Sequence, residues 1–90
     1  MLKTLEELIT IIRQRKESSI DESYTKKLLT NKKLSFEKVK EEIAELIDAV
    51  EKNTNKVHEA ADVLYHLMVL LEANDIKIED VMDELKKRQK

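Results

Sequence analysis

The chain has 90 residues, with 17 Lys or Arg against 19 Asp or Glu, and no cysteine. Its length predicts one domain over residues 1–90, and its nearly balanced charge argues against a nucleic-acid-binding surface. The lack of cysteine excludes disulfides and zinc–thiolate sites. The longest apolar run, Leu67–Leu71, is too short to span a membrane, and the first residues lack the apolar segment of a signal peptide. We therefore expect a cytoplasmic protein that binds neither nucleic acid nor membrane.

Glycine and proline are both absent, and only 3% of the residues are aromatic. This composition predicts an all-α fold of four to five helices, in which Asn, Asp, Ser and Thr make the turns. Apolar residues that recur at helical spacing place these helices along the chain. They are expected over Leu2–Lys16, Tyr24–Asn31, about Ser35–Lys52, Lys56–Ala73 and Ile78–Lys87.

Capping residues predict where the helices begin and end. Thr4, with Glu7 three residues later, fits a capping box for the first helix, and residues 17–23 fit a loop. The second helix is expected to end at Asn31–Lys33, and Ser35 or its neighbour is expected to cap the third. The residues expected to face inward are Leu5, Leu8, Ile9 and Ile12 in the first helix, Leu28 and Leu29 in the second, Val39, Ile43, Leu46 and Val50 in the third, and Ile78, Val81, Met82 and Leu85 in the last.

The fourth helix is apolar on almost every side, which is typical of a helix buried on more than one side. Within it, Tyr65 and Met68 are expected to pack, whereas His58 is expected at the surface. Residues 53–55 form so short a connection that the fourth helix is expected to run antiparallel to the third. A chain of this size with such a helix needs additional core from a partner. We therefore predict an antiparallel bundle completed by homodimerisation.

Two pairs of carboxylates lie on the third and fourth helices. Glu42 and Glu45 are three residues apart, as are Glu59 and Asp62, so each pair shares one helix face. Antiparallel packing would bring all four together. Like charges one turn apart cost roughly 0.2–0.5 kcal/mol even on an exposed surface, so a cation is expected between the pairs. Oxygen ligands favour Mg²⁺ or Mn²⁺; the alternative is an acidic surface patch.

These carboxylates belong to a longer pattern. Glu41-Glu42-x-x-Glu45 followed by Glu59-x-x-Asp62 resembles the metal signature of the MazG-like all-α nucleotide pyrophosphohydrolases. Within that superfamily, the chain resembles the phosphoribosyl-ATP pyrophosphohydrolases of histidine biosynthesis. The segments that carry this closer resemblance are Ser23–Thr25, Leu28–Leu29, Lys38–Glu42, Glu59–Leu67 and Ile78–Leu85.

The resemblance implies a homodimeric helical bundle that hydrolyses phosphoribosyl-ATP to phosphoribosyl-AMP and pyrophosphate with Mg²⁺. By position, it assigns four carboxylates as both catalytic residues and metal ligands, and a fifth as a catalytic residue. For the fifth, the alternatives are a second cation, the attacking water, or only the helix surface. Lys40 stands where the family usually has glycine, which permits closer approach of a substrate. The four ligands are Glu42, Glu45, Glu59 and Asp62, and the fifth carboxylate is Glu41.

Five further residues are candidates for substrate binding. Ser23, Tyr24 and Thr25 lead into the second helix, whose first N–H groups would favour an anion such as the extra ribose phosphate. Tyr24 is expected to stack on a base, to bind a phosphate or to pack. Lys38 lies toward the acidic side of its helix, with a solvated surface role as the alternative. His66 is expected to be buried and hydrogen-bonded to a neighbour, with a role as ligand or base as the alternative.

Two other functions fit the same sequence. One is a related pyrophosphohydrolase that acts on other nucleoside triphosphates, since it would share the acidic pairs and differ in the residues that contact substrate. The other is a non-catalytic helical dimer or adaptor, because an idealised helical bundle has a similar composition. The acidic pairs argue against an adaptor, since unpaired buried carboxylates destabilise a scaffold.

Overall fold

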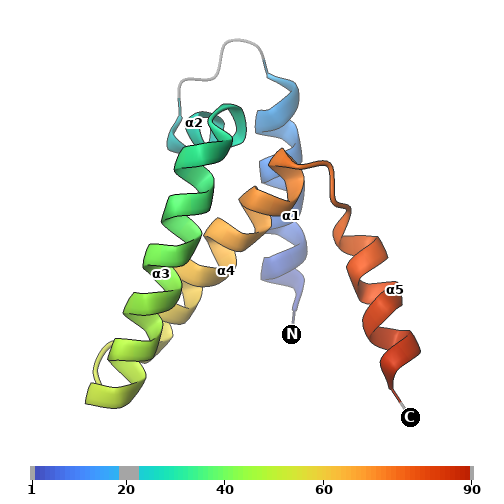
Figure 1. Cartoon of the computed structure of the whole chain (residues 1–90). Coiled ribbons are helices and arrows are strands. Elements are labelled where there is room, and N and C mark those ends of the chain that lie inside the picture. The colour runs from blue at the N-terminus through green and yellow to red at the C-terminus, as the bar shows by residue number, and fades with distance from the viewer. Residues whose placement is uncertain (1, 19–22, 90) are drawn as a thin grey trace.

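The computed structural model describes residues 2–18 and 23–89, and these residues form five α-helices (Figure 1). The predicted all-α class is therefore confirmed. The bounds agree closely with the prediction except at the start of the third helix. The helices are α1 (Lys3–Glu17), α2 (Tyr24–Thr30), α3 (Lys32–Lys52), α4 (Lys56–Ala73) and α5 (Ile78–Arg88).

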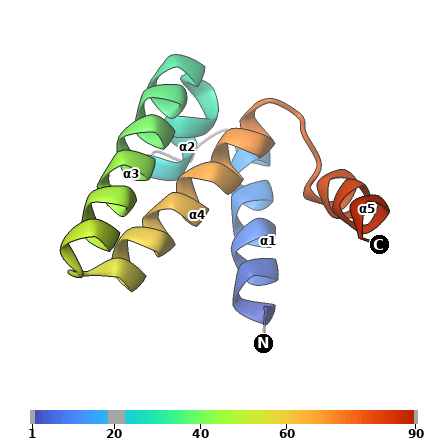
Figure 2. The same ribbon diagram turned by 60° about the horizontal axis from the view of Figure 1, so that its bottom comes forward.

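The central helix is α4. It packs against α1, α2 and α3, and α2 also contacts both α1 and α3. Figure 1 shows α4 turning back along α3, as expected from their short connection, and Figure 2 shows α1 on the opposite side of α4. The hairpin of α3 and α4 therefore brings the two helices that carry the acidic pairs side by side.

The buried core is small and lies where α1, α2 and α4 meet. Leu28 and Leu29 of α2 point inward, as predicted, and Ile12 of α1 is fully buried. From α4, Met68 and Val69 pack into this core. None of the helices in the described part of the chain is long and apolar enough to cross a membrane.

The turn between α3 and α4 contains two residues in the left-handed region. Asn53 has a φ of 56° and Asn55 a φ of 44°. Asparagine adopts this conformation more readily than most residues other than glycine, and this chain has no glycine. The turn is closed by the N–H of Thr54, which donates to the carbonyl of Ala49 at 3.0 Å. These contacts fix the position at which α4 begins.

Two predicted helix caps differ from the structure. Thr4 does not cap α1, because it lies inside the helix and Leu2 occupies the capping position. Ser35 does not cap α3 either: Asn31 does, and its Oδ1 accepts from the N–H of Leu34 at 3.1 Å. Asn31 also ends α2, so one residue serves both helices and no loop is needed. Ser35 is instead buried inside α3.

The predicted loop over residues 17–23 is described only in part. Glu17 belongs to α1 rather than to the loop. Ser23 caps α2, and its Oγ accepts from the N–H of Lys26 at 3.2 Å. The prediction for residues 19–22 lies outside the described residues.

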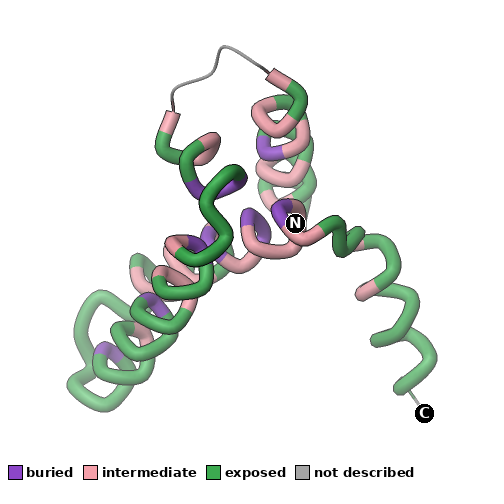
Figure 3. The backbone as a smooth tube through the Cα atoms, turned by 45° about the horizontal axis from the view of Figure 1, so that its top comes forward, coloured by how far each residue is buried: buried purple, intermediate pink, exposed green. Residues whose placement is uncertain are grey.

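Several side chains that were predicted to be buried are exposed in the single chain. Ile43 and Val50 of α3 are exposed, and Met82 and Leu85 of α5 are each about half exposed, at 49% and 48%. Figure 3 shows α5 almost entirely exposed. Helix α4 is also less enclosed than predicted, because Val57 and Leu64 face outward. The physical reason is that one chain supplies no second surface against these faces.

Candidate active site

The carboxylates predicted on α3 form one close group. Glu41, Glu42 and Glu45 each offer an oxygen, and these oxygens lie within 4.8 Å of one another. Glu42 is buried, whereas Glu41 and Glu45 are exposed. The group therefore combines one desolvated carboxyl with two that solvent reaches.

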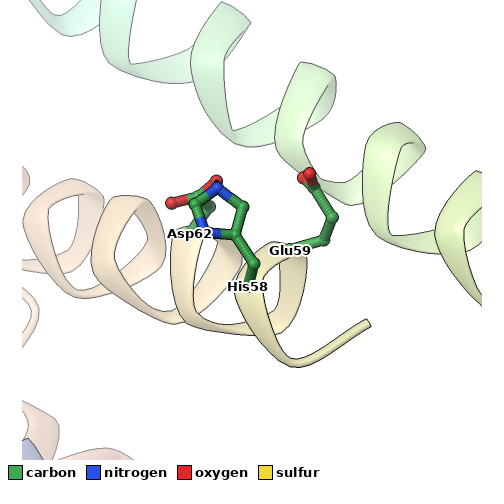
Figure 4. A group of neighbouring side chains, drawn as sticks. All are labelled: His58, Glu59 and Asp62. Carbon is green, nitrogen blue, oxygen red and sulfur yellow. The ribbon is translucent and has the colours of Figure 1, made fainter. Parts of the chain in front are cut away.

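A second group lies at the start of α4. Potential ligand atoms of His58, Glu59 and Asp62 also lie within 4.8 Å of one another. Figure 4 shows His58 beside Asp62, whereas Glu59 points toward the ribbon of α3. His58 Nε2 is 3.4 Å from an oxygen of Asp62. His58 is exposed, as predicted, but its place beside Asp62 was not predicted, although their spacing of four residues is a usable signal.

The two groups affect each other across the helix pair. Burial is the main cause that raises the pKa of Glu42, followed by its hydrogen bond to Glu45 and the charge of Glu45. The charge of Asp62 on α4 raises the pKa of Glu42 further, whereas His66 acts in the opposite direction. The carboxylates of α3 and α4 therefore belong to one electrostatic site, although the four predicted ligands are divided between two groups.

Two carboxylate oxygens in this site have no partner. Oε2 of Glu42 and Oε2 of Glu59 are buried and accept no hydrogen bond from any residue that the structure describes. A buried carboxylate without a partner is strongly unfavourable. One oxygen comes from each helix, and an all-oxygen set suits a hard divalent cation. The residues present therefore fit the cation that the sequence predicts.

Lys38 forms an ion pair with the acidic group of α3. Its Nζ lies 3.4 Å from Oε2 of Glu41, and the hydrogen bond and charge of Glu41 raise the pKa of Lys38. Glu42 also contributes to this rise. The positive charge at the edge of the site is thus stabilised mainly by Glu41, with a smaller contribution from Glu42, one of the four predicted ligands.

The remaining predicted residues lie where α2 meets α4, and most of them already have partners within the protein. Tyr24 Oη lies 3.1 Å from Nε2 of His66, and Thr25 is hydrogen-bonded to the hydroxyl of Tyr65. His66 is buried and hydrogen-bonded to neighbours, which confirms that prediction. Ser23 serves as the cap of α2. The pairing of Tyr24 with His66 was not predicted, because the two residues are far apart in the sequence.

Comparison with known proteins identifies the family. Residues 5–89 match the family described as phosphoribosyl-ATP pyrophosphohydrolase. The chain is 44% identical to the phosphoribosyl-ATP pyrophosphatase of Allorhizobium ampelinum, with 94% of this chain and 85% of that protein covered. It is 42% identical to the protein of the same name from Clostridium novyi, covering 99% of this chain and 84% of that protein.

One relative is much longer than this chain. The histidine biosynthesis bifunctional protein HisIE of Pyrococcus furiosus is 44% identical over 99% of this chain, which spans 43% of that protein's length. The similarity thus covers less than half of the Pyrococcus furiosus protein. Because the family match and the shorter relatives cover almost the whole chain, the chain belongs to the phosphoribosyl-ATP pyrophosphohydrolase family.

Proposed function

We propose that this chain hydrolyses phosphoribosyl-ATP to phosphoribosyl-AMP and pyrophosphate in histidine biosynthesis. The observation that carries the proposal is the pair of unpartnered, buried oxygens of Glu42 and Glu59, in a member of this family. The names of its relatives support the substrate. A cytoplasmic location remains a prediction.

We propose that Glu42, Glu45, Glu59 and Asp62 hold Mg²⁺, or Mn²⁺ in its place. When bound, the cation neutralises charge on the leaving pyrophosphate and makes the attacking water more acidic. Lys38 would add a positive charge for the phosphates at the edge of the site. Glu41 is exposed and paired with Lys38, so we assign it a role outside the ligand set, such as accepting a proton from water.

The active form is proposed to be a homodimer. Monomeric proteins rarely expose large contiguous apolar patches, and in the described part of this chain exposed large apolar side chains lie on α1, α3, α4 and α5. A second copy would cover them and enlarge a small core. These exposed residues include Ile11 on α1, Phe36, Ile43, Ile47 and Val50 on α3, Val57 and Leu64 on α4, and Met82 and Leu85 on α5.

Substrate choice is assigned to groups outside the acidic site. We propose that Ser23 and Thr25 contact the ribose phosphate that ATP lacks. A few hydrogen bonds to a charged group are worth roughly 3–5 kcal/mol in total, which corresponds to a preference over ATP of at least about 100-fold in kcat/KM. Substituting Ser23→Ala together with Thr25→Val should reduce this preference more than it reduces ATP cleavage. Because Ser23 also caps α2, the melting temperature of the variant is measured to separate an effect on folding from an effect on substrate binding.

The decisive experiment follows pyrophosphate release from phosphoribosyl-ATP and from a panel of nucleoside triphosphates, each with Mg²⁺. Cleavage of phosphoribosyl-ATP with high preference is the expected result. Comparable efficiency on ATP or a deoxynucleoside triphosphate would instead identify a related pyrophosphohydrolase. Full folding in chelator, with weak Mg²⁺ binding and no hydrolysis of any compound, would identify a non-catalytic helical dimer.

A further inference from the structure

Helix α5 carries an apolar face that its own chain leaves uncovered. None of its residues is buried, and the helix extends away from the rest of the chain (Figures 1 and 3). Ile78 packs against the core, and Val81, Met82 and Leu85 follow on the same side of the helix. This apolar stripe, residues 78, 81, 82 and 85, therefore begins at the core and continues into solvent.

A projecting helix of this length needs a covering surface. Isolated helices shorter than about 12 to 15 residues are marginal in water even for good helix formers, and α5 has 11 residues. Its charged anchor lies at the first turn, where Arg13 of α1 donates to both carboxylate oxygens of Glu79. The half of the stripe beyond this turn, with Met82 and Leu85 exposed, has no support from its own chain among the described residues.

The order of the apolar residues fits a second copy of the same helix. In a twofold dimer the same patch faces itself, so two antiparallel helices meet in reverse order. An axis between residues 81 and 82 places Ile78 opposite Leu85 of the partner subunit, and Val81 opposite Met82 of the partner subunit. Every apolar position of the stripe then faces an apolar position, and no charged side chain enters the contact.

The charges of α5 also favour an antiparallel pair. All acidic residues of the helix precede Leu85 and all basic residues follow it, so antiparallel pairing lays the acidic half along the basic half of the other copy. Parallel pairing would place like charges side by side. The dipole of a single helix favours the same distribution, so the charges support the orientation that the apolar order indicates. The acidic residues are Glu79, Asp80, Asp83 and Glu84, and the basic residues are Lys86, Lys87 and Arg88.

We propose that α5 pairs antiparallel with α5 of a second copy of this chain, about a twofold axis between Val81 and Met82. The proposal rests on the homodimer of the proposed function and names one of its contacts. The stripe of an 11-residue helix is smaller than the roughly 800 Å² that each partner buries in a stable interface. The α5 pair therefore adds to contacts made by the other exposed apolar faces and does not hold the dimer alone.

Disulfide formation tests the register. The chain has no cysteine, so a single introduced cysteine can pair only with the same residue of a second copy. In the proposed register the two copies of residue 82 are offset by one residue, or about 1.5 Å along the helices. The two copies of residue 85 are offset by about 10 Å, beyond the Cα separation of about 7 Å that a disulfide tolerates. Met82→Cys should therefore crosslink under mild oxidation, and Leu85→Cys should not.

Asp83→Cys is the matched control, because residue 83 adjoins Met82 in sequence and lies on the far side of α5 from the stripe. It measures crosslinking by random collision of exposed cysteines and should give only a background yield. Crosslinking of both Met82→Cys and Leu85→Cys would indicate a parallel pair and would overturn the proposal. Background yields from all three variants, in a protein that sediments as a dimer, would also overturn it, because α5 would then dock elsewhere.

A second test uses charge at the centre of the pair. Met82→Asp and Met82→Lys each bring like charges together across the axis, so each should raise the Kd of the dimer by about 10-fold or more. An equimolar mixture brings opposite charges together and should recover most of the wild-type affinity. A mixture no tighter than the separate variants would contradict the α5 pair alone. A wild type that sediments as a monomer would instead contradict the homodimer, and pyrophosphate release tests the proposed reaction independently.

Discussion

Arg13 of α1 holds Glu79 of α5 through two hydrogen bonds, of 2.9 and 2.6 Å. The same guanidinium donates to Glu72 near the end of α4 at 2.8 Å. Helix α5 extends away from the other helices in both views (Figures 1 and 2). Its direction therefore depends on a charged contact at its first turn more than on apolar packing.

This contact predicts a dependence of stability on acid. The hydrogen bond and charge of Arg13 lower the pKa of Glu79 from 4.5 to about 2. A lowered pKa in the folded state means that the stabilisation is present above the unfolded value and is lost as the pH falls toward 2. Glu79→Gln should therefore reduce the melting temperature at pH 7, and the difference from wild type should shrink below about pH 4.5.

Glu84→Gln is the control for this measurement. Glu84 pairs with Arg88 on its own helix, at 3.3 Å, and exposed pairs of this kind contribute little. Its effect on melting should be small at every pH. If the melting temperatures of Glu79→Gln and the wild type differ by the same amount at pH 7 and pH 3, the pair with Arg13 does not stabilise the fold.

The acidic residues should be required for turnover but not for folding. Glu42→Gln, Glu45→Gln, Glu59→Gln and Asp62→Asn should each lower kcat by more than about 100-fold, since even outer-shell partners of a metal cost 10- to 100-fold. Circular dichroism should show an unchanged helix content. Glu37→Gln and Glu51→Gln, which change exposed residues of α3 outside the two acidic groups, should be nearly silent. Wild-type activity of the four variants at low Mg²⁺ would refute the site.

Without metal, Glu42→Gln should be at least as stable as the wild type at neutral pH. Burial and neighbouring carboxylates make the ionised form of Glu42 unfavourable, as its raised pKa indicates. Glutamine has nearly the same shape and stays neutral, so the cost of a buried charge disappears. Thermal melting in chelator measures this. A clear loss of stability would mean that Glu42 has a structural partner in the absence of metal.

Mg²⁺ should stabilise the wild type and not the site variants. A ligand that binds only the folded state at 100 times its Kd adds about 2.7 kcal/mol. The melting temperature of the wild type should therefore rise with Mg²⁺ and fall again with chelator, whereas Glu59→Gln should respond much less. An equal rise in both proteins would place the cation elsewhere.

Sedimentation at micromolar concentration should give about twice the mass of one chain. Leu64→Glu, at an apolar residue exposed in the single chain, should shift the protein toward the monomer, because a charge would have to be buried in the interface. Glu37→Lys, which changes the charge of an exposed polar residue of α3, serves as the control. A wild type that sediments as a folded, fully active monomer would exclude the homodimer.

Much of this arrangement could be predicted from local patterns. The three-residue spacing of Glu42 with Glu45, and of Glu59 with Asp62, fixes each pair on one helix face whatever the tertiary fold. Helix boundaries were predicted least well between α2 and α3, because Asn31 is both the C-cap of α2 and the N-cap of α3. The exposure of Met82 and Leu85 could not be predicted, because a hydrophobic pattern shows that a face will be covered and not which chain covers it.

Contacts between distant segments were also beyond the sequence. Tyr24 and His66 meet because α2 packs against α4, and no spacing rule links them. The contribution of Asp62 to the pKa of Glu42, by contrast, agrees with the antiparallel packing of α3 and α4 that the sequence predicts. Side-chain identity indicated that these residues were functional candidates, and only the packing of the helices showed which of them act on one another.

The asparagine turn between α3 and α4 has a consequence for how this site can vary among proteins. Each residue added to an α-helix rotates the later residues by about 100° around the helix axis, so a single insertion between Val50 and Glu59 that lengthened either helix would turn one acidic pair away from the other. The turn itself is tight, since Asn53 and Asn55 already adopt left-handed conformations, and it has little room to absorb an added residue. The number of residues from Glu45 to Glu59 is therefore as much a part of the site as the carboxylates. Chains that share all four acidic residues but have one residue more or fewer between Glu45 and Glu59 should be expected to lack the proposed cation site.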